Sequence, residues 1–121
     1  MKICVTSQGD NLEAQIDPRF GRCQYFIFVE TDTMEFEAVS NQNISGMGGV
    51  GVQSGQIVSE KGAQVILTGS VGPNAMRTLQ AGGVQVMDGL SGTIREAIEQ
   101  YKRGSLKSTD KPSAQSKAGM Q

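Results

Sequence analysis

The sequence has no histidine and only two cysteines, and these absences exclude several kinds of site. Histidine is the commonest metal ligand and the usual general base, so zinc sites of His and Cys, and Ser-His or Cys-His nucleophiles, are excluded. The strand positions where a two-metal nuclease would need aspartate hold Cys4 and Thr6. No lysine lies near a serine in the candidate loops to replace the missing base. We therefore predict a binding protein and not an enzyme.

The two cysteines are predicted to be reduced thiols, as expected for a cytosolic chain. Cys4 falls within an apolar run that predicts a strand, so we expect it in the core. Cys23 stands at the start of another apolar run and has two interpretations. It either packs as a small apolar residue or contacts a soft metal or sulfide.

Long apolar runs are also absent. Nothing approaches the roughly 18 residues that span a bilayer, and no signal-peptide pattern follows Met1. We therefore predict a cytoplasmic protein without membrane contact. The net charge is −1, and residues 104–121 hold three lysines against Asp110, so the rest of the chain is net acidic. Because nucleic-acid binding needs a basic face, we do not predict a nucleic-acid partner.

The first half of the chain predicts three strands, over residues 2–7, 24–30 and 34–40. A short polar turn at residues 31–33 joins the last two, which indicates an antiparallel hairpin. The second half alternates between helical and strand patterns. We expect helices over 52–61, from Pro73 to 81 and from 94 to about 101, with strands over 64–68 and 84–87.

Several local signals support these helix boundaries. Gly62 suits a helix C-terminus, Pro73 suits a first helical position, and Thr93 with Glu96 forms a possible capping box. The pattern predicts one α/β domain over residues 1–103, with a mixed, mostly parallel sheet of about five strands. Residues 104–121 are rich in Ser, Lys, Gly and Pro, so we predict a disordered polar tail.

Three glycine-rich loops, residues 44–51, 69–72 and 88–92, lead from β elements into predicted helices. Such loops share the edge at the carboxyl ends of parallel strands, where ligands usually bind. Glycine lets backbone amides approach a ligand, and helix N-termini favour anions. The alternative is that the glycines only make tight turns. The run at 46–51 lacks the features of a nucleotide-binding loop.

A further candidate is the stretch Asp17-Pro18-Arg19-Phe20-Gly21-Arg22-Cys23. The guanidinium groups of Arg19 and Arg22 suit an anion, although they could instead pair with nearby carboxylates. Met47, in the first glycine loop, could offer a thioether to a soft metal or could simply be an exposed loop residue.

Four segments, at 17–22, 49–53, 68–75 and 92–97, occur in the order seen in the dinitrogenase iron-molybdenum cofactor biosynthesis family, which the chain resembles. The resemblance implies a ribonuclease-H-like α/β fold without nuclease activity. It also implies non-covalent binding of an anionic iron–sulfur or molybdenum–sulfur cluster. Family members often carry histidine in the segment matching 43–48, and this chain has none there, so a His-ligated cluster is excluded.

The loops and the resemblance together predict a carrier for such a cluster or its precursor, with metallocluster-assembly or acceptor proteins as partners. The alternative is a regulatory or protein-interaction module that uses the same cleft for a small anion or a partner. Cys23 is the candidate metal ligand. The predicted cluster-binding residues are Arg19, Phe20, Gly21, Arg22, Cys23, Met47, Gly48, Gly49, Gly51, Gly69, Gly72 and Asn74.

Overall fold

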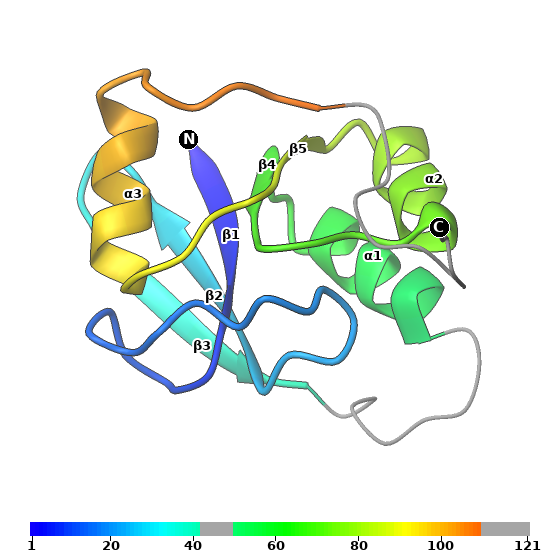
Figure 1. Cartoon of the computed structure of the whole chain (residues 1–121), viewed down its shortest axis with the longest axis horizontal. Helices are drawn as coiled ribbons and strands as arrows, with labels where there is room; N and C mark the ends of the chain where they lie inside the picture. The colour runs from blue at the N-terminus through cyan, green and yellow to red at the C-terminus, as the bar shows by residue number, and fades with distance from the viewer. Residues whose placement is uncertain (42–49, 110–121) are drawn as a thin grey trace.

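The computed structural model describes residues 1–41 and 50–109. They form an α/β domain with five strands and three helices (Figure 1). In chain order the elements are β1 (Lys2–Ser7), β2 (Tyr25–Glu30), β3 (Phe36–Ser40), α1 (Val50–Glu60), β4 (Val65–Leu67), α2 (Pro73–Ala81), β5 (Gln85–Met87) and α3 (Ile94–Lys102). Each lies within a few residues of its predicted position.

The strands form one mixed sheet in the order β3-β2-β1-β4-β5, which confirms the predicted five-stranded architecture. Strand β1 pairs in parallel with β4, and β4 pairs in parallel with β5. Strand β2 is antiparallel to both β1 and β3. The expectation of a mostly parallel sheet is therefore wrong, since half of the pairings are antiparallel. The loop from β1 to β2 contains no crossover helix, so β2 returns antiparallel to β1.

The sheet is covered on both faces, and the alternation along β1 shows how. Cys4 packs in the cluster that includes α1 and α2 residues such as Val58 and Leu79. Ile3 and Val5 point to the other face, where they pack with Ile98 of α3. Figure 1 shows the same arrangement, with α3 on one side of the sheet and the α1–α2 pair on the other.

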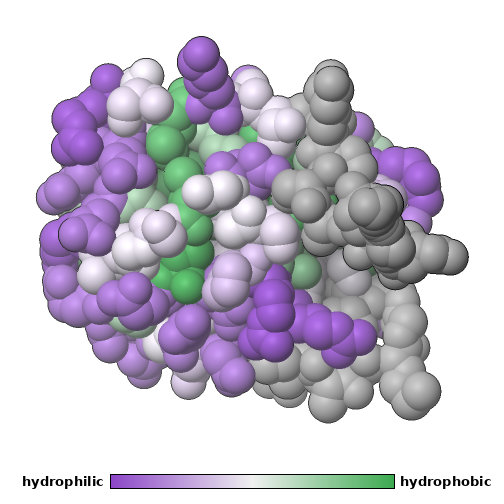
Figure 2. All heavy atoms as spheres, viewed as in Figure 1, coloured by the Kyte–Doolittle hydropathy of each residue, from purple (hydrophilic) through white to green (hydrophobic). Residues whose placement is uncertain are grey.

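Within the described residues, one helix packs on the α3 face and two pack on the other, so the α3 face is covered less completely. Leu90, Tyr101 and Leu106 are only partly buried where they pack against this core. Figure 2 shows a narrow apolar band beside α3, within an otherwise mostly hydrophilic face.

The predicted helix boundaries depend on local signals that the structure confirms. Gly62 follows α1 with φ +85°, a conformation that favours glycine. Thr93 and Glu96 form the capping box at the start of α3: the Thr93 hydroxyl accepts from the Glu96 amide, and the Glu96 carboxylate accepts from the Thr93 amide.

Residues 104–109, which we call the strap, continue from α3 towards the β5 edge (Figure 1). The Thr109 amide donates to the Val86 carbonyl at 2.8 Å, and Leu106 packs against the α3-face core. This part of the predicted tail therefore contacts the domain through Leu106 and Thr109. Residues 110–121 lie outside the described residues, and the domain boundary at 103 stays a prediction. Across residues 1–41 and 50–109, no helix is long and apolar enough to cross a membrane.

Candidate functional site

Residues 17–24, the arginine loop, run over the carboxyl edge of the parallel strands. Asp17 at its start is 1% exposed, and one of its carboxylate oxygens accepts from the Arg19 amide at 3.1 Å and from Arg19 Nε at 3.3 Å. The Arg19 side chain remains 59% exposed. Arg22 is exposed as well. The loop therefore presents two cations to solvent, one of them held by a buried carboxylate.

The arginine loop docks directly on the loop that leads into α2. The Phe20 amide donates to the Ser70 carbonyl at 3.1 Å, and the Ser70 amide donates to the Pro18 carbonyl at 2.7 Å. A Cβ on Gly69 would stand 2.6 Å from the Pro18 Cα, so only glycine allows this approach. The structure thus brings Arg19 and Gly69, which are 50 positions apart in sequence, to one junction.

The N-terminus of α2 lies three residues beyond this junction. Gly72 occupies the N-cap, and no side chain in the described part of the chain caps the helix. Its first turn has no acidic residue, and Pro73 has no amide to satisfy. The start of α1 lies beside it, because a Cβ on Gly51 would stand 3.6 Å from the Ala75 amide nitrogen. The first turns of two helices, each with partial positive charge, therefore lie side by side, and the α2 start follows the junction with the arginine loop.

The third predicted helix start does not fit the anion site. The Ile94 amide donates to the Ala14 carbonyl and the Arg95 amide to the Leu12 carbonyl, both at 2.9 Å. The Glu96 amide donates to the Thr93 hydroxyl, and the Glu96 carboxylate lies at the same end. Because its donors are used and an acid is present, the start of α3 offers no place for an anion. The prediction that the loop at residues 88–92 contributes to the anion site is therefore corrected: this loop is not part of it.

Three predicted cluster-binding residues of the arginine loop are buried or shape its backbone, and do not face solvent. Phe20 is 8% exposed and packs edge-on against Phe26, with ring centroids 6.1 Å apart. Gly21 has φ +96°, which favours glycine. Cys23 is 0% exposed and packs in the core. Burial, with a smaller effect from the Asp17 charge, raises the pKa of the Cys23 thiol to about 12. A neutral, buried thiol is a poor metal ligand.

Sequence reasoning missed Asn41, at the end of β3. Its side chain is 4% exposed, and its amide nitrogen donates to the Gly21 carbonyl at 3.0 Å and to the Cys23 carbonyl at 2.9 Å. These two carbonyls flank Arg22. No sequence pattern marks this role, because the contact joins residues about 20 positions apart.

The remaining predicted residues fall into two groups, those at the helix starts and those outside the described part of the chain. Gly51, Gly72 and Asn74 lie at the two helix starts, and Asn74 is exposed there. Met47, Gly48 and Gly49 lie outside the described residues. Among the residues that the structure describes, no three His, Cys, Asp or Glu side chains gather as a metal site.

Two surface hollows, of about 460 and 490 Å³, border the strap and not the arginine loop. The arginine loop and the start of α2 are therefore distinguished by charge and amide geometry and not by a hollow in the described surface. What the arrangement can do chemically is bind an anion, through two guanidinium groups and the amides of two helix starts.

Comparison with known proteins places this geometry in a family. The family model for "Dinitrogenase iron-molybdenum cofactor" matches residues 1–104. The apo form of the orange protein from Desulfovibrio gigas is 36% identical with a TM-score of 0.91, covering 93% of this chain and 96% of that one. A putative NifB protein from Thermotoga is 32% identical with a TM-score of 0.81, covering 93% and 97%.

An uncharacterized protein from Methanocaldococcus jannaschii is 30% identical over 109 residues, which are 88% of this chain and 89% of that protein. The family match includes the arginine loop and the starts of α2 and α3. The chain therefore belongs to the dinitrogenase iron-molybdenum cofactor family.

Proposed function

We propose that this protein is a non-catalytic carrier that binds an anionic iron–sulfur or molybdenum–sulfur cluster, or its precursor, without covalent bonds. The observation that carries the proposal is the junction between the arginine loop and the start of α2. There, the Pro18–Ser70 hydrogen bond joins two exposed arginines to a helix N-terminus that no described side chain caps. Family membership supports this choice of anion.

Local charge is what allows an anion to bind to a net acidic domain. Asp17, Arg19 and Arg22 together give the arginine loop a formal charge of about +1. The starts of α1 and α2 each add the equivalent of about half a charge. Hydrogen bonds from charged donors contribute about 1.5–3 kcal/mol each. A few such contacts are enough for micromolar binding of a small polyanion.

This mode of binding suits a carrier because it leaves the metals coordinated by sulfide. A cluster held by hydrogen bonds and charge is released without breaking a protein–metal bond. We therefore include metallocluster-assembly or acceptor proteins as the partners that load and unload the site. Cys23 is left out of the binding set because its thiol is buried and neutral.

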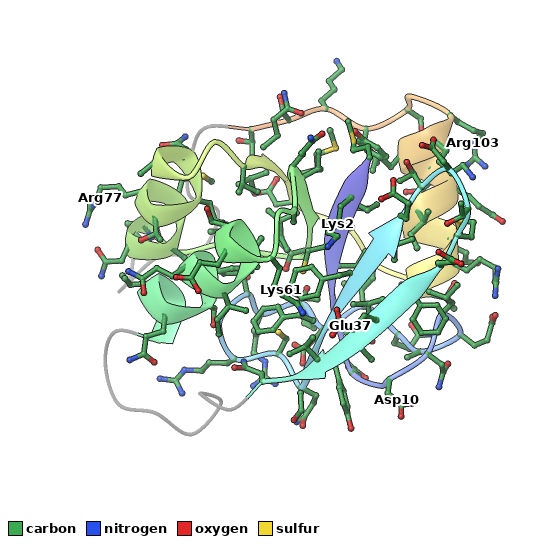
Figure 3. All side chains as sticks on the ribbon, turned by 180° about the vertical axis from the view of Figure 1, so that it is seen from behind. Lys2, Asp10, Glu37, Lys61, Arg77 and Arg103 are labelled. Carbon is green, nitrogen blue, oxygen red and sulfur yellow. The ribbon has the colours of Figure 1, made fainter. Side chains whose placement is uncertain are left out.

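The proposal is tested by titrating the protein with tetrathiomolybdate, followed by absorbance and by amide chemical shifts. Arg19→Ala with Arg22→Ala should weaken binding at least about 100-fold, because two charge-assisted contacts are lost. Lys102→Ala with Arg103→Ala is the matched control. It removes the same charge near the C-terminal end of α3, and Figure 3 shows Arg103 on the opposite side of the molecule from Arg77 of α2. The control should bind nearly as tightly as the wild type.

Two results would contradict the proposal. One is equal loss in both double variants, which would indicate a nonspecific charge effect. The other is a set of shifted amides that avoids residues 17–24 and the start of α2. Anaerobic purification from the native host with elemental analysis gives a second test, since a carrier should retain molybdenum, copper or iron.

A further inference from the structure

We propose that two buried polar side chains, Asp17 and Asn41, are positioning residues that build the arginine loop before any ligand arrives. Asp17 orients Arg19, and Asn41 fixes the backbone on both sides of Arg22. The role of the two arginines rests on the proposed function. The preformed state of the loop rests only on contacts within the protein.

The backbone of Asp17 is hydrogen-bonded to the sheet. Its amide donates to the Thr6 carbonyl at 3.0 Å, and its carbonyl accepts from the Thr6 hydroxyl at 2.7 Å. The Thr6 hydroxyl also lies 2.7 Å from the hydroxyl of Thr68, at the end of β4. The position of Asp17 is therefore set by two neighbouring parallel strands.

The Asp17 carboxylate then closes the loop. One oxygen accepts from the Arg19 amide and Nε, and the other accepts from the Gln24 amide at 3.3 Å. Both ends of the loop are thus tied to one buried group. While its Nε donates to Asp17, the Arg19 side chain stays 59% exposed, so the guanidinium is held and still accessible. Fixing the side chain in advance reduces the conformational entropy that a ligand would otherwise have to overcome.

Asn41 holds the backbone on both sides of Arg22. Its side-chain nitrogen donates to the carbonyls of Gly21 and Cys23, the residues on either side of Arg22, and its own amide donates to the Gln24 carbonyl at 3.0 Å. The segment from Gly21 to Gln24 is therefore held against the end of β3. The backbone of Arg22 is fixed although its side chain is exposed.

The positioning role and a simple charge effect predict opposite signs for Asp17. Asp17→Asn removes a negative charge beside the site, so charge alone would strengthen anion binding. It also turns a two-sided acceptor into a group with a donor facing the loop amides, so Arg19 would lose its fixed orientation. We expect the second effect to win, with tetrathiomolybdate binding weakened about tenfold.

Asp10→Asn is the matched control, since Asp10 is exposed and its loss changes the net charge equally. It should leave binding unchanged or slightly stronger. In an Arg19→Ala background, Asp17→Asn should no longer weaken binding and should strengthen it slightly, because the side chain that Asp17 positions is gone and only the charge effect remains. Tighter binding by Asp17→Asn when Arg19 is present, or a full tenfold loss that persists without Arg19, would overturn the proposal.

Asn41 is tested in the same way. Asn41→Ala should weaken binding several-fold in the wild type and hardly at all in an Arg22→Ala background. Asn11→Ala is its control, an exposed asparagine outside the arginine loop. A loss from Asn41→Ala that is equal in both backgrounds would show that Asn41 only supports folding, and would overturn its assignment.

A measurement on the unmodified protein needs neither a variant nor a ligand. The Arg19 Nε–H should exchange with solvent much more slowly than that of exposed Arg103, because it donates to a buried carboxylate. If the wild type does not bind tetrathiomolybdate, the proposed function fails, and slow exchange still supports the preformed loop. Equal exchange at Arg19 and Arg103 would overturn the positioning role of Asp17 whatever the ligand.

Discussion

The starts of α2 and α3 look alike in sequence and differ in the structure. Both follow glycine-rich loops at the same edge of the sheet. At α3, the capping box and the carbonyls of Leu12 and Ala14 take the first donors, and Glu96 supplies a negative charge. At α2, no described side chain caps the helix and the first turn has no acid. The amide donors at the α3 start are used by other groups of the protein, whereas no described side chain caps those at the α2 start, so they can bind a ligand.

The difference lies in what each glycine loop contacts. The loop before α3 meets the backbone of residues 12–16, whereas the loop before α2 meets the arginine loop. A glycine loop and a helix start therefore do not define an anion site on their own. The neighbouring segment decides whether the helix donors are consumed or presented.

The largest expected effect comes from breaking the junction beside α2. Gly69→Ala would place a Cβ 2.6 Å from the Pro18 Cα and 2.8 Å from the Pro18 carbonyl oxygen, so the arginine loop must move. The free energy of unfolding, measured with urea, should fall by about 2–3 kcal/mol. Gly72→Ala is the control, because nothing lies within 4 Å of the position that its Cβ would take and its φ is −78°. It should cost less than about 1 kcal/mol, and equal losses would contradict the close approach at Gly69.

The next largest effect is a pH dependence of stability, which tests whether the Cys23 thiol is exposed to solvent or buried in the core. Its pKa is raised from 9.0 to about 12 in the folded protein, so the unfolded thiol ionises first as the pH rises. The contribution of the protonated Cys23 thiol to the free energy of unfolding is complete below about pH 9 and is lost between about pH 9 and 12. At pH 10 the wild type should lose about 1.4 kcal/mol that Cys23→Ala does not lose. Identical pH profiles from urea unfolding would place the thiol in solvent.

Thr93→Ala should affect stability without affecting the ligand. The change removes the hydroxyl that accepts from the Glu96 amide, and it should lower the free energy of unfolding by about 1 kcal/mol. Tetrathiomolybdate affinity should stay unchanged, because this helix start is already closed. A change in affinity of more than about threefold would return α3 to the anion site.

Asn74→Asp should have the smallest effect and should act in two directions. A carboxylate in the first turn of α2 favours the helix by about 0.3–1 kcal/mol. The same charge repels an anion, so tetrathiomolybdate affinity should fall about threefold. Thermal unfolding and titration of the same sample measure both effects. If affinity rises or does not change, the ligand does not sit at the α2 start.

Much of the fold could be predicted because its signals are local. The apolar run at residues 25–29, the helix-starting Pro73 and the pair Thr93–Glu96 each act within a few residues. The equal share of antiparallel pairings was missed, since strand direction depends on a long connection without a helix. In the site, Arg19 and Gly69 were predicted, but their junction through Ser70 was not. The burial of Cys23 and the role of Asn41 depend on contacts between distant segments, which residue spacing does not encode.

The hydrogen bond from Thr109 to Val86 also has a practical meaning for anyone shortening this protein. Strand β5 is an outer strand of the sheet, and an uncovered outer strand offers backbone groups to any extended peptide nearby. A version that stops at residue 104 would remove this cover together with Leu106. A version that stops after Thr109 would keep both, so the safe place for a protease site or an affinity tag is beyond residue 109.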